Sequence, residues 1–186
     1  MPLAQTSTSF TYPSGDNISC FGFNDGSIDY TPSGGSPGYT FAWTGPNGFT
    51  SVTEDINTLV AGTYDVTITD INGCILDTTI VLDQPTPLTE STILSVYPSG
   101  DNISCIGASD GTIDLTNTGG SPGYTFSWTA SNGGVVPVGQ NTQEDLTGLV
   151  AGTYTVDATD INGCVVTTIV DLVEPTAIIS LSLIHI

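Results

Sequence analysis

The chain has 186 residues and a formal net charge of −19, because it contains 19 Asp and Glu residues, one His, and neither Lys nor Arg. Nucleic acid is excluded as a partner, since Lys and Arg supply the phosphate neutralisation on which that binding depends. An anionic membrane surface would repel the chain as well. Every carboxylate must therefore be solvated, hydrogen-bonded within the protein or neutralised by a bound cation.

The two ends of the chain predict that it is a piece of a larger protein. MPLAQTSTSF at the N-terminus lacks the basic segment and apolar run of a signal peptide, and no stretch approaches the roughly 18 apolar residues of a membrane span. We therefore expect no membrane insertion. At the other end, LSLIHI (181–186) reads like a translated sequencing-library adaptor, which would make the only His an artefact; a native strand starting at Ala177 is the alternative.

Two copies of one repeat make up most of the chain. Four strings recur, the first two at an offset of 85 residues and the last two at 90, so the second copy holds 90 − 85 = 5 more residues. The strings are YPSGDNISC (12–20 and 97–105), GGSPGYTF (34–41 and 119–126), LVAGTY (59–64 and 149–154) and TDINGC (69–74 and 159–164). The insertion precedes the third string, and we assign it to a surface loop.

The boundary between the copies is predicted at two closely spaced prolines. Pro85 and Pro87 cannot both serve a central strand and favour an extended connector, after which residues 88–96 form a candidate strand. The predicted domains are residues 1–85 and 86–176, which are called the first and the second copy below. Residues 177–186 are predicted to begin a third repeat.

Both copies show the pattern of β-strands. In TYDVTITD (63–70), Tyr64, Val66 and Ile68 alternate with polar residues, as in a half-buried antiparallel strand. Gly-Gly, Asn-Gly and Asp-Gly pairs separate such segments, and no window has helical periodicity. We predict an all-β fold of two tandem immunoglobulin-like antiparallel β-sandwich repeats.

Four aromatic residues are predicted to lie in the cores. Trp43 shares one strand face with Tyr39 and Phe41, and Trp128 occupies the same place in the second copy. Tyr64 and Tyr154 end an L-x-x-G-x-Y pattern that is typical of a tyrosine corner, in which the hydroxyl bonds back to nearby backbone. A plain half-buried tyrosine is the alternative.

One cysteine pair falls in each copy, and each pair is widely spaced in sequence. Cys20 and Cys74 are 74 − 20 = 54 residues apart, and Cys105 and Cys164 are 164 − 105 = 59 apart, unlike the short spacing of a zinc site. We predict the disulfides Cys20–Cys74 and Cys105–Cys164, and hence an oxidising, extracytoplasmic setting. Two pairs of buried free thiols are the alternative.

Calcium is the cofactor that the composition suggests, because carboxylate and amide oxygens are abundant. The full calcium-loop pattern is missing, however, and the string DING (70–73) also suits a tight hairpin turn. Turn residue and calcium ligand therefore stay alternatives for the candidates. They are Asp16, Asp25, Asp29, Asp70 and Asn72 in the first copy, and Asp101, Asp110, Asp114, Asp160 and Asn162 in the second.

Catalysis is not expected. Acid–base and nucleophilic mechanisms need a base that titrates near neutrality, and the only His lies in the doubtful tail. The carboxylate pairs Glu54-Asp55 and Glu144-Asp145 are adjacent in sequence, so on a strand their side chains point to opposite faces. No phosphate-binding or dinucleotide-binding fingerprint is present.

The order of the motifs resembles the SprB-type repeat of giant cell-surface adhesins from gliding and related Bacteroidetes. The residues that match are Cys20, Gly22 and Asp25-Gly26-Ser27-Ile28, then GGSPGYTFAW, LVAGTYDVTITDINGC and a closing strand that ends at Gln84-Pro85, with a second copy that ends at Glu174-Pro175. Gly38 and Gly123 depart from the pattern, since a second Pro is common there. The resemblance implies a secreted repeat protein on the bacterial surface, exported by the type IX route and linked to gliding motility.

Three functions are compatible with the sequence. The first is an adhesive or spacer repeat, whose partners are neighbouring repeats and an unknown surface glycan or protein. The second is a carbohydrate-binding module of a secreted polysaccharide-degrading enzyme, for which Phe21, Phe23 and Phe49 are available, although the second copy has Ile106 and Ala108 where Phe21 and Phe23 stand. The third is a structural filament subunit.

Overall fold

The computed structural model describes residues 2–177, which form β-strands, loops and one short 3₁₀ turn. Two compact units are present. The first consists of Met1–Leu88 with the segments Gly119–Gly123 and Asp160–Cys164, and the second of Thr89–Thr118, Tyr124–Thr159 and the residues from Val165 onward. The predicted third repeat, apart from Ala177, and the proposed adaptor tail lie outside the described residues.

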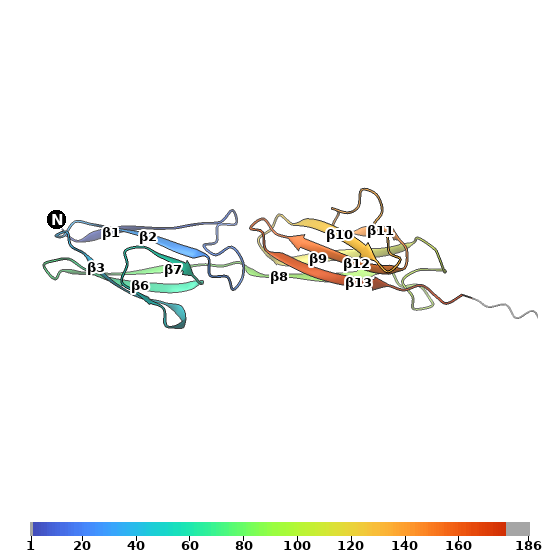
Figure 1. Ribbon diagram of the computed structural model, residues 1–186, viewed down its shortest axis with the longest axis horizontal. Coiled ribbons are helices and arrows are strands. Elements are labelled where there is room, and N and C mark those ends of the chain that lie inside the picture. Colours follow the sequence, from blue (N-terminus) through green and yellow to red (C-terminus); the bar gives the residue numbers. More distant parts are fainter. Residues whose placement is uncertain (1, 178–186) are drawn as a thin grey trace, which may run out of the picture. The chain divides into compact units, whose positions relative to one another are not determined.

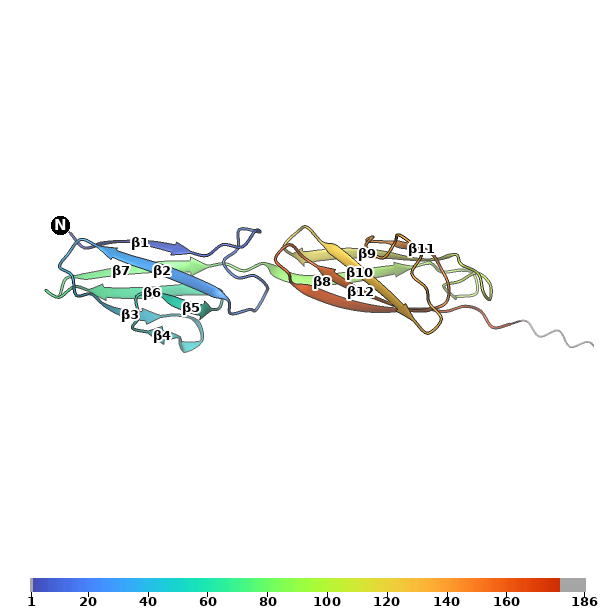
Figure 2. The ribbon, with the colours of Figure 1, turned by 45° about the horizontal axis from the view of Figure 1, so that its top comes forward.

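The first unit contains two antiparallel sheets (Figure 1). One has the order β1-β2-β5, and the other has the order β4-β3-β6-β7. The strands are β1 Ala4–Ser9, β2 Gly26–Ser33, β3 Thr40–Thr44, β4 Thr50–Ser51, β5 Ile56–Leu59, β6 Gly62–Thr69 and β7 Ile75–Leu82, with the 3₁₀ turn η1 at Pro46–Gly48. Figure 2 shows β1 lying along β2, as their register from Ala4 opposite Ser33 to Ser9 opposite Ile28 requires.

The second unit repeats this arrangement without a counterpart of β4 among its described residues. Its sheets have the orders β11-β9-β8 and β10-β12-β13. The strands are β8 Thr86–Leu94, β9 Gly111–Gly120, β10 Thr125–Ser131, β11 Leu146–Leu149, β12 Gly152–Thr159 and β13 Val165–Leu172. Because β8 begins at Thr86, it starts within the predicted proline connector. The domain limits 1–85 and 86–176 stay a prediction.

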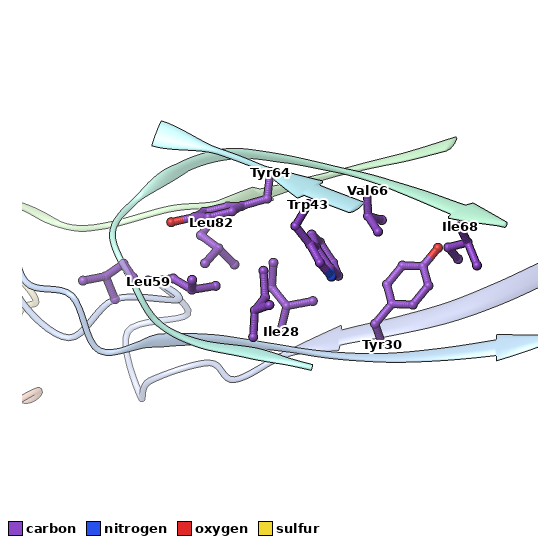
Figure 3. Close-up of a cluster of buried hydrophobic side chains, with 10 residues drawn as sticks. Ile28, Tyr30, Trp43, Leu59, Tyr64, Val66, Ile68 and Leu82 are labelled. Carbon is purple, nitrogen blue, oxygen red and sulfur yellow. The ribbon is translucent and has the colours of Figure 1, made fainter. Parts of the chain in front are cut away.

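The core of the first unit lies between its two sheets (Figure 3). Tyr64, Val66 and Ile68 are all buried while the residues between them are not, as the alternation in the sequence predicts. Trp43 from β3 and Tyr30 from β2 meet edge to face with ring centroids 5.4 Å apart. Apolar side chains from both sheets thus fill one layer, which is the defining feature of a β-sandwich.

The second core uses the same positions. Trp128 and Tyr154 are 4% and 0% exposed, close to the 1% of both Trp43 and Tyr64. Leu115 occupies the place of Tyr30 in this core. The all-β, immunoglobulin-like sandwich predicted from the sequence is therefore confirmed in both copies.

Both tyrosine hydroxyls bond back to backbone at the start of their strands. The hydroxyl of Tyr64 donates to the carbonyl oxygen of Val60 at 3.0 Å, and that of Tyr154 donates to the carbonyl oxygen of Val150 at 2.9 Å. This is the geometry of a tyrosine corner, which joins the end of one sheet to the start of a strand in the other.

Candidate functional site

The segment that carries Cys20 is held against the C-terminal end of β7. The N–H groups of Asn17 and Ile18 both donate to the carbonyl oxygen of Asp83, at 3.0 and 3.1 Å. The side-chain oxygen of Asn17 accepts from the N–H of Asp83 at 3.0 Å, and the N–H of Gly22 donates to Gln84 Oε1 at 2.8 Å. Ile18 is fully buried, so the segment is anchored by packing and by backbone bonds together.

Asp25 organises the same segment through its carboxylate. It accepts hydrogen bonds from the N–H of Ser19 at 3.1 Å, from the Ser19 hydroxyl, and from the hydroxyl of Tyr12 at 2.9 Å. Burial alone would raise the pKa of Asp25, but these donors outweigh it, so the pKa lies below its ordinary value. The carboxylate of a residue predicted as a calcium ligand is thus occupied by protein donors.

The turn between β6 and β7 carries Cys74 and is built around Asp70. Asp70 Oδ1 accepts from the N–H groups of Asn72 and Cys74, each at 2.9 Å, and Oδ2 accepts from the N–H of Ser36 at 3.0 Å. The N–H of Cys74, followed by that of Ser36, holds the pKa of Asp70 below its ordinary value. The Asp70 carboxylate thus accepts three backbone hydrogen bonds, two within the turn and one from Ser36.

The corresponding turn of the second copy, Asp160–Cys164, has the same internal bonds and belongs to the first compact unit. Asp160 accepts from the N–H groups of Asn162 and Cys164 at 2.9 Å each, and from that of Ser121 at 2.9 Å. Within this unit, a disulfide joins Cys164 to Cys20.

Asn162 is two residues from Cys164 and hydrogen-bonds residues near the disulfide. Its side-chain amide nitrogen is within bonding distance of Ser14 Oγ (2.9 Å), the carbonyl oxygen of Ser19 (3.1 Å) and Ser121 Oγ (2.9 Å). The disulfide and these contacts together form what we call the cysteine junction: Ser14, Ser19, Cys20, Asn162 and Cys164.

The predicted disulfides Cys20–Cys74 and Cys105–Cys164 are wrong, because Cys74 and Cys105 are free and exposed. Cys20 lies near the C-terminal end of β7, whereas Cys74 comes immediately before its N-terminal end. A strand of 8 residues separates them, and at a rise of about 3.3 Å per residue this is about 25 Å. A disulfide needs Cα atoms about 4.4–6.8 Å apart.

The same separation applies to the other predicted pair. The segment of Cys105 is bonded to the end of β13 through the N–H of Asn102 and the carbonyl oxygen of Val173, 3.0 Å apart, whereas Cys164 directly precedes β13. The sequence identifies all four cysteines. The pairing was missed because the two cysteines of one copy stand at opposite ends of one strand.

The carboxylates among the ten candidate calcium residues do not form a metal-binding cluster in the described part of the chain. Within residues 2–177, no group of three or more His, Cys, Asp or Glu side chains is arranged to hold a metal ion. Asp29 and Asp114 are exposed at matching positions of β2 and β9. Asp16 and Asp101 accept through their backbone oxygens from Tyr12 and Tyr97, in matching short loops.

The aromatic side chains considered for carbohydrate binding are divided by the fold. Phe21 and Phe23 are 53% and 55% exposed. Phe49 instead packs edge to face on Tyr64, with ring centroids 5.5 Å apart, and contributes to the core. In the second copy, Ile106 is exposed and Ala108 packs against the core. A pair of exposed rings is therefore present in the first copy alone among the described residues at these sites.

Comparison with known proteins finds a match to the same family model in each copy. Residues 15–48 and 100–133 match the SprB repeat, one match in each copy, so the resemblance of the sequence is confirmed. No curated protein matches the chain. Among residues 2–177 there is no helix of the length and apolarity that spanning a membrane requires.

Several solved structures match the chain at low sequence identity. The C-terminal 282-residue fragment of intimin, crystallised in complex with the intimin-binding domain of the translocated intimin receptor, has a TM-score of 0.48 and 14% identity over 91% of this chain and 64% of that chain. The N-terminal eight Ig domains of Down Syndrome Cell Adhesion Molecule isoform 1.30.30 have a TM-score of 0.43 and 13% identity, over 94% of this chain and 25% of that chain. Murine CEACAM1b has a TM-score of 0.33 and 12% identity, over 91% of this chain and 100% of that chain. The chain thus spans less than two thirds of the first two structures.

Proposed function

We propose that this chain, which carries an SprB repeat in each of its two copies, is a non-catalytic segment of a large extracellular surface protein of bacteria, acting in adhesion or as a spacer stalk. The observation that carries the proposal is the cysteine junction: a turn and a loop that recur in both copies are joined by a disulfide. Stable disulfides are typical of oxidising, extracytoplasmic compartments. Export by the type IX route and a role in gliding motility are parts of this proposal that follow from the family.

The chemistry of the polar side chains supports a structural role. Carboxylates that would be candidates for acid–base work are used to hold turns, as Asp25 and Asp70 illustrate. Others are paired with hydroxyls across strands: the Thr67 hydroxyl donates to Asp77 at 2.7 Å and the Thr79 hydroxyl to Asp65 at 2.6 Å. Such pairs replace the salt bridges that a chain without Lys and Arg cannot form.

The domain limits 1–85 and 86–176 form part of the proposal. Each range contains a complete pair of sheets, and the sequence identity of the repeated strings predicts that each range folds around its own core. Neighbouring repeats are then the first partners of each domain, and a surface glycan or protein is the second.

Surface exposure tests the proposal most directly. In the bacterium that encodes the chain, antibody fragments raised against the purified protein should label intact cells, and protease treatment of those cells should remove the label. If the fragments also reduce attachment of the cells to a surface, the segment is adhesive; if they label without blocking, it is a spacer. Label that appears only after cell lysis would contradict both roles.

A carbohydrate-binding module is the second candidate, favoured by the exposed Phe21 and Phe23. Aromatic rings on a surface stack against sugar rings, and replacing both with Ala would remove that contact. Retardation of the chain in gels that contain soluble polysaccharides, lost in the double variant but kept in Phe10→Ala, would support this function. Equal migration of all three proteins in every polysaccharide would exclude it.

Calcium binding is the remaining open alternative. We propose that Asp70, Asp160 and their neighbours act as turn residues, because their oxygens already accept backbone hydrogen bonds. Calcium should then raise the melting temperature no more than sodium at matched ionic strength, since both act by screening the net negative charge. A larger increase with calcium would restore the metal site.

A further inference from the structure

The cysteine junction joins two kinds of cysteine, one in a loop and one in a turn, and the chain contains two of each kind. Cys20 and Cys105 follow the string DNIS in the loop before a strand, and Cys74 and Cys164 end the string DING in a turn. One cysteine of each kind, Cys20 and Cys164, forms the disulfide. The other two, Cys105 and Cys74, are free and exposed.

Cys105 is held in the same frame as Cys20. The N–H of Asn102 donates to the carbonyl oxygen of Val173 at 3.0 Å, as that of Asn17 does to Asp83. The N–H of Gly107 donates to Glu174 Oε2 at 2.7 Å, which matches the bond from Gly22 to Gln84. The loop that presents the thiol is therefore preformed in the second copy, although its cysteine is unbonded.

The acceptors around that thiol are repeated too. Asp110 accepts from both the N–H and the hydroxyl of Ser104, as Asp25 does from Ser19. Ser99 Oγ accepts from the N–H of Asp101 at 3.3 Å, as Ser14 Oγ does from Asp16 at 3.2 Å. The oxygens that Asn162 contacts in the junction, on Ser14 and Ser19, thus have counterparts beside Cys105.

Cys74 is held in the same frame as Cys164. Asp70 accepts from the N–H groups of Asn72 and Cys74 in the geometry that Asp160 uses. The Asn72 side-chain amide donates to Ser36 Oγ at 2.7 Å, the counterpart of the Asn162 bond to Ser121. Asn72 is exposed, and its side-chain amide has a second hydrogen besides the one donated to Ser36. The equivalent residue, Asn162, contacts Ser14 and Ser19 of the cysteine junction with its side-chain amide.

We infer that Cys74 and Cys105 are the two halves of a second cysteine junction, completed by further copies of the same repeat. Cys105 bonds the DING cysteine of a following copy, and Cys74 bonds the DNIS cysteine of a preceding one. The repeats then form a covalent series in which every copy is linked to its neighbours. This inference rests on the proposed role as a segment of a repeat array, but it concerns a covalent bond and not adhesion.

Formation of each bond is an ordinary thiol–disulfide exchange. One thiolate attacks a small-molecule disulfide such as oxidised glutathione and releases one glutathione thiolate; the second cysteine then attacks the mixed disulfide and releases the other. Two protein thiols become one disulfide, and one oxidant disulfide becomes two thiols. The exposed positions of Cys74 and Cys105 allow this access.

A second copy of this chain serves as the probe. The purified protein, incubated in a buffer of oxidised and reduced glutathione, should form a ladder of covalent oligomers on a non-reducing gel, with Cys74–Cys105 as the linking peptide pair in mass spectrometry. The variants Cys74→Ser and Cys105→Ser should each lose the ladder beyond a dimer. In an equimolar mixture of the two variants, the mixed dimer should be more than about twice as abundant as either homodimer, which is the proportion that random pairing gives. The double variant should remain monomeric with the Cys20–Cys164 bond intact, which controls for folding.

Recognition is separated from random oxidation by Asn72→Ala. This exposed substitution should slow Cys74–Cys105 formation about threefold to tenfold, the effect of losing about one hydrogen bond, without changing the reaction of Cys74 with a small thiol reagent. A mixed Cys74–Cys105 bond no more than about twice as abundant as either the Cys74–Cys74 or the Cys105–Cys105 bond, which is the proportion of random pairing, would overturn the inference, as would the absence of any ladder. Either result leaves the surface-labelling test of the proposed function unaffected.

Discussion

In the first copy Tyr30 stands edge to face against Trp43, with ring centroids 5.4 Å apart, whereas in the second copy Leu115 takes the place of Tyr30 beside Trp128. Both tryptophans are almost fully buried, and both indole N–H groups donate to a backbone carbonyl oxygen at 2.9 Å, that of Thr53 or that of Gln143. The frame of the sandwich therefore accepts different side chains in one core layer, provided that the layer is filled and the indole is bonded.

The loops that follow β3 and β10 differ more. In the first copy, Phe49 packs on Tyr64 beside the turn η1. In the second, the longer loop brings the N–H of Val135 to the hydroxyl oxygen of Tyr154 at 3.3 Å. An apolar contact in one copy is thus replaced by a polar one in the other, around an unchanged tyrosine corner.

The largest expected difference concerns the two tryptophans. Trp43→Ala should reduce the free energy of unfolding by about 3–5 kcal/mol, and Trp128→Ala by about 1 kcal/mol less, because Leu115 offers no edge-to-face contact. Chemical denaturation followed by circular dichroism measures both, and in each variant the fluorescence of the remaining tryptophan reports on the other copy. Unchanged unfolding of Trp43→Ala would mean that the ring is exposed, and would favour carbohydrate binding.

Gly62 and Gly152, which begin β6 and β12, test how closely the loops after β3 and β10 pack in the two copies. A Cβ at Gly152 would lie 2.1 Å from the backbone nitrogen of Gly134, whereas one at Gly62 would lie 2.5 Å from the ring carbon Cγ of Pro46. Backbone yields less than the edge of a ring, so Gly152→Ala should cost about 3 kcal/mol, at the upper end for single substitutions. Gly62→Ala should cost less.

The control for this pair is Gly73→Ala, where φ is +85° and no atom lies within 4 Å of the added Cβ. It isolates the cost of a left-handed backbone, about 1–2 kcal/mol. Thermal melts of the three variants should rank Gly73, Gly62 and Gly152 in order of increasing loss. Equal losses at all three positions would show that the loop contacts contribute nothing.

The tyrosine corners should differ by a smaller amount. Tyr154→Phe removes the acceptor of the Val135 N–H as well as the donor to Val150, so we expect a loss of about 1–3 kcal/mol. Tyr64→Phe removes one bond, to Val60, and should cost about 1 kcal/mol. Denaturant titrations of the two variants measure the difference, and a larger loss for Tyr64→Phe would contradict the assignment.

Acid should affect the folded state through the carboxylates that hold the loops and turns. The pKa values of Asp25, Asp70 and Asp110 are lower in the folded chain than the ordinary value of about 3.9 in the unfolded chain. Their stabilising effect is therefore present above about pH 4 and is lost as the pH falls toward the folded-state pKa. Asp70→Asn should flatten the decrease in stability below about pH 4, and denaturant titrations of the variant and the parent chain at several acidic pH values measure the difference.

Much of the fold follows from local patterns. The alternation of Tyr64, Val66 and Ile68 with polar residues places these side chains on one face of a strand, and the repetition of the whole pattern predicts two sandwiches. The L-x-x-G-x-Y pattern likewise predicts the tyrosine corners, because its residues are close in sequence and form one local structure.

The partner of each cysteine was decided by the tertiary structure alone. Sequence counting places Cys20 and Cys74 in one copy, yet the N–H of Ile18 bonds Asp83 at the far end of β7 from Cys74. Which end of a strand a loop contacts depends on hydrogen bonds between residues more than sixty positions apart. No local pattern contains that information. The strings around the cysteines determine the shape of each half of the junction, and the length of one β-strand determines that the two halves of one copy do not meet.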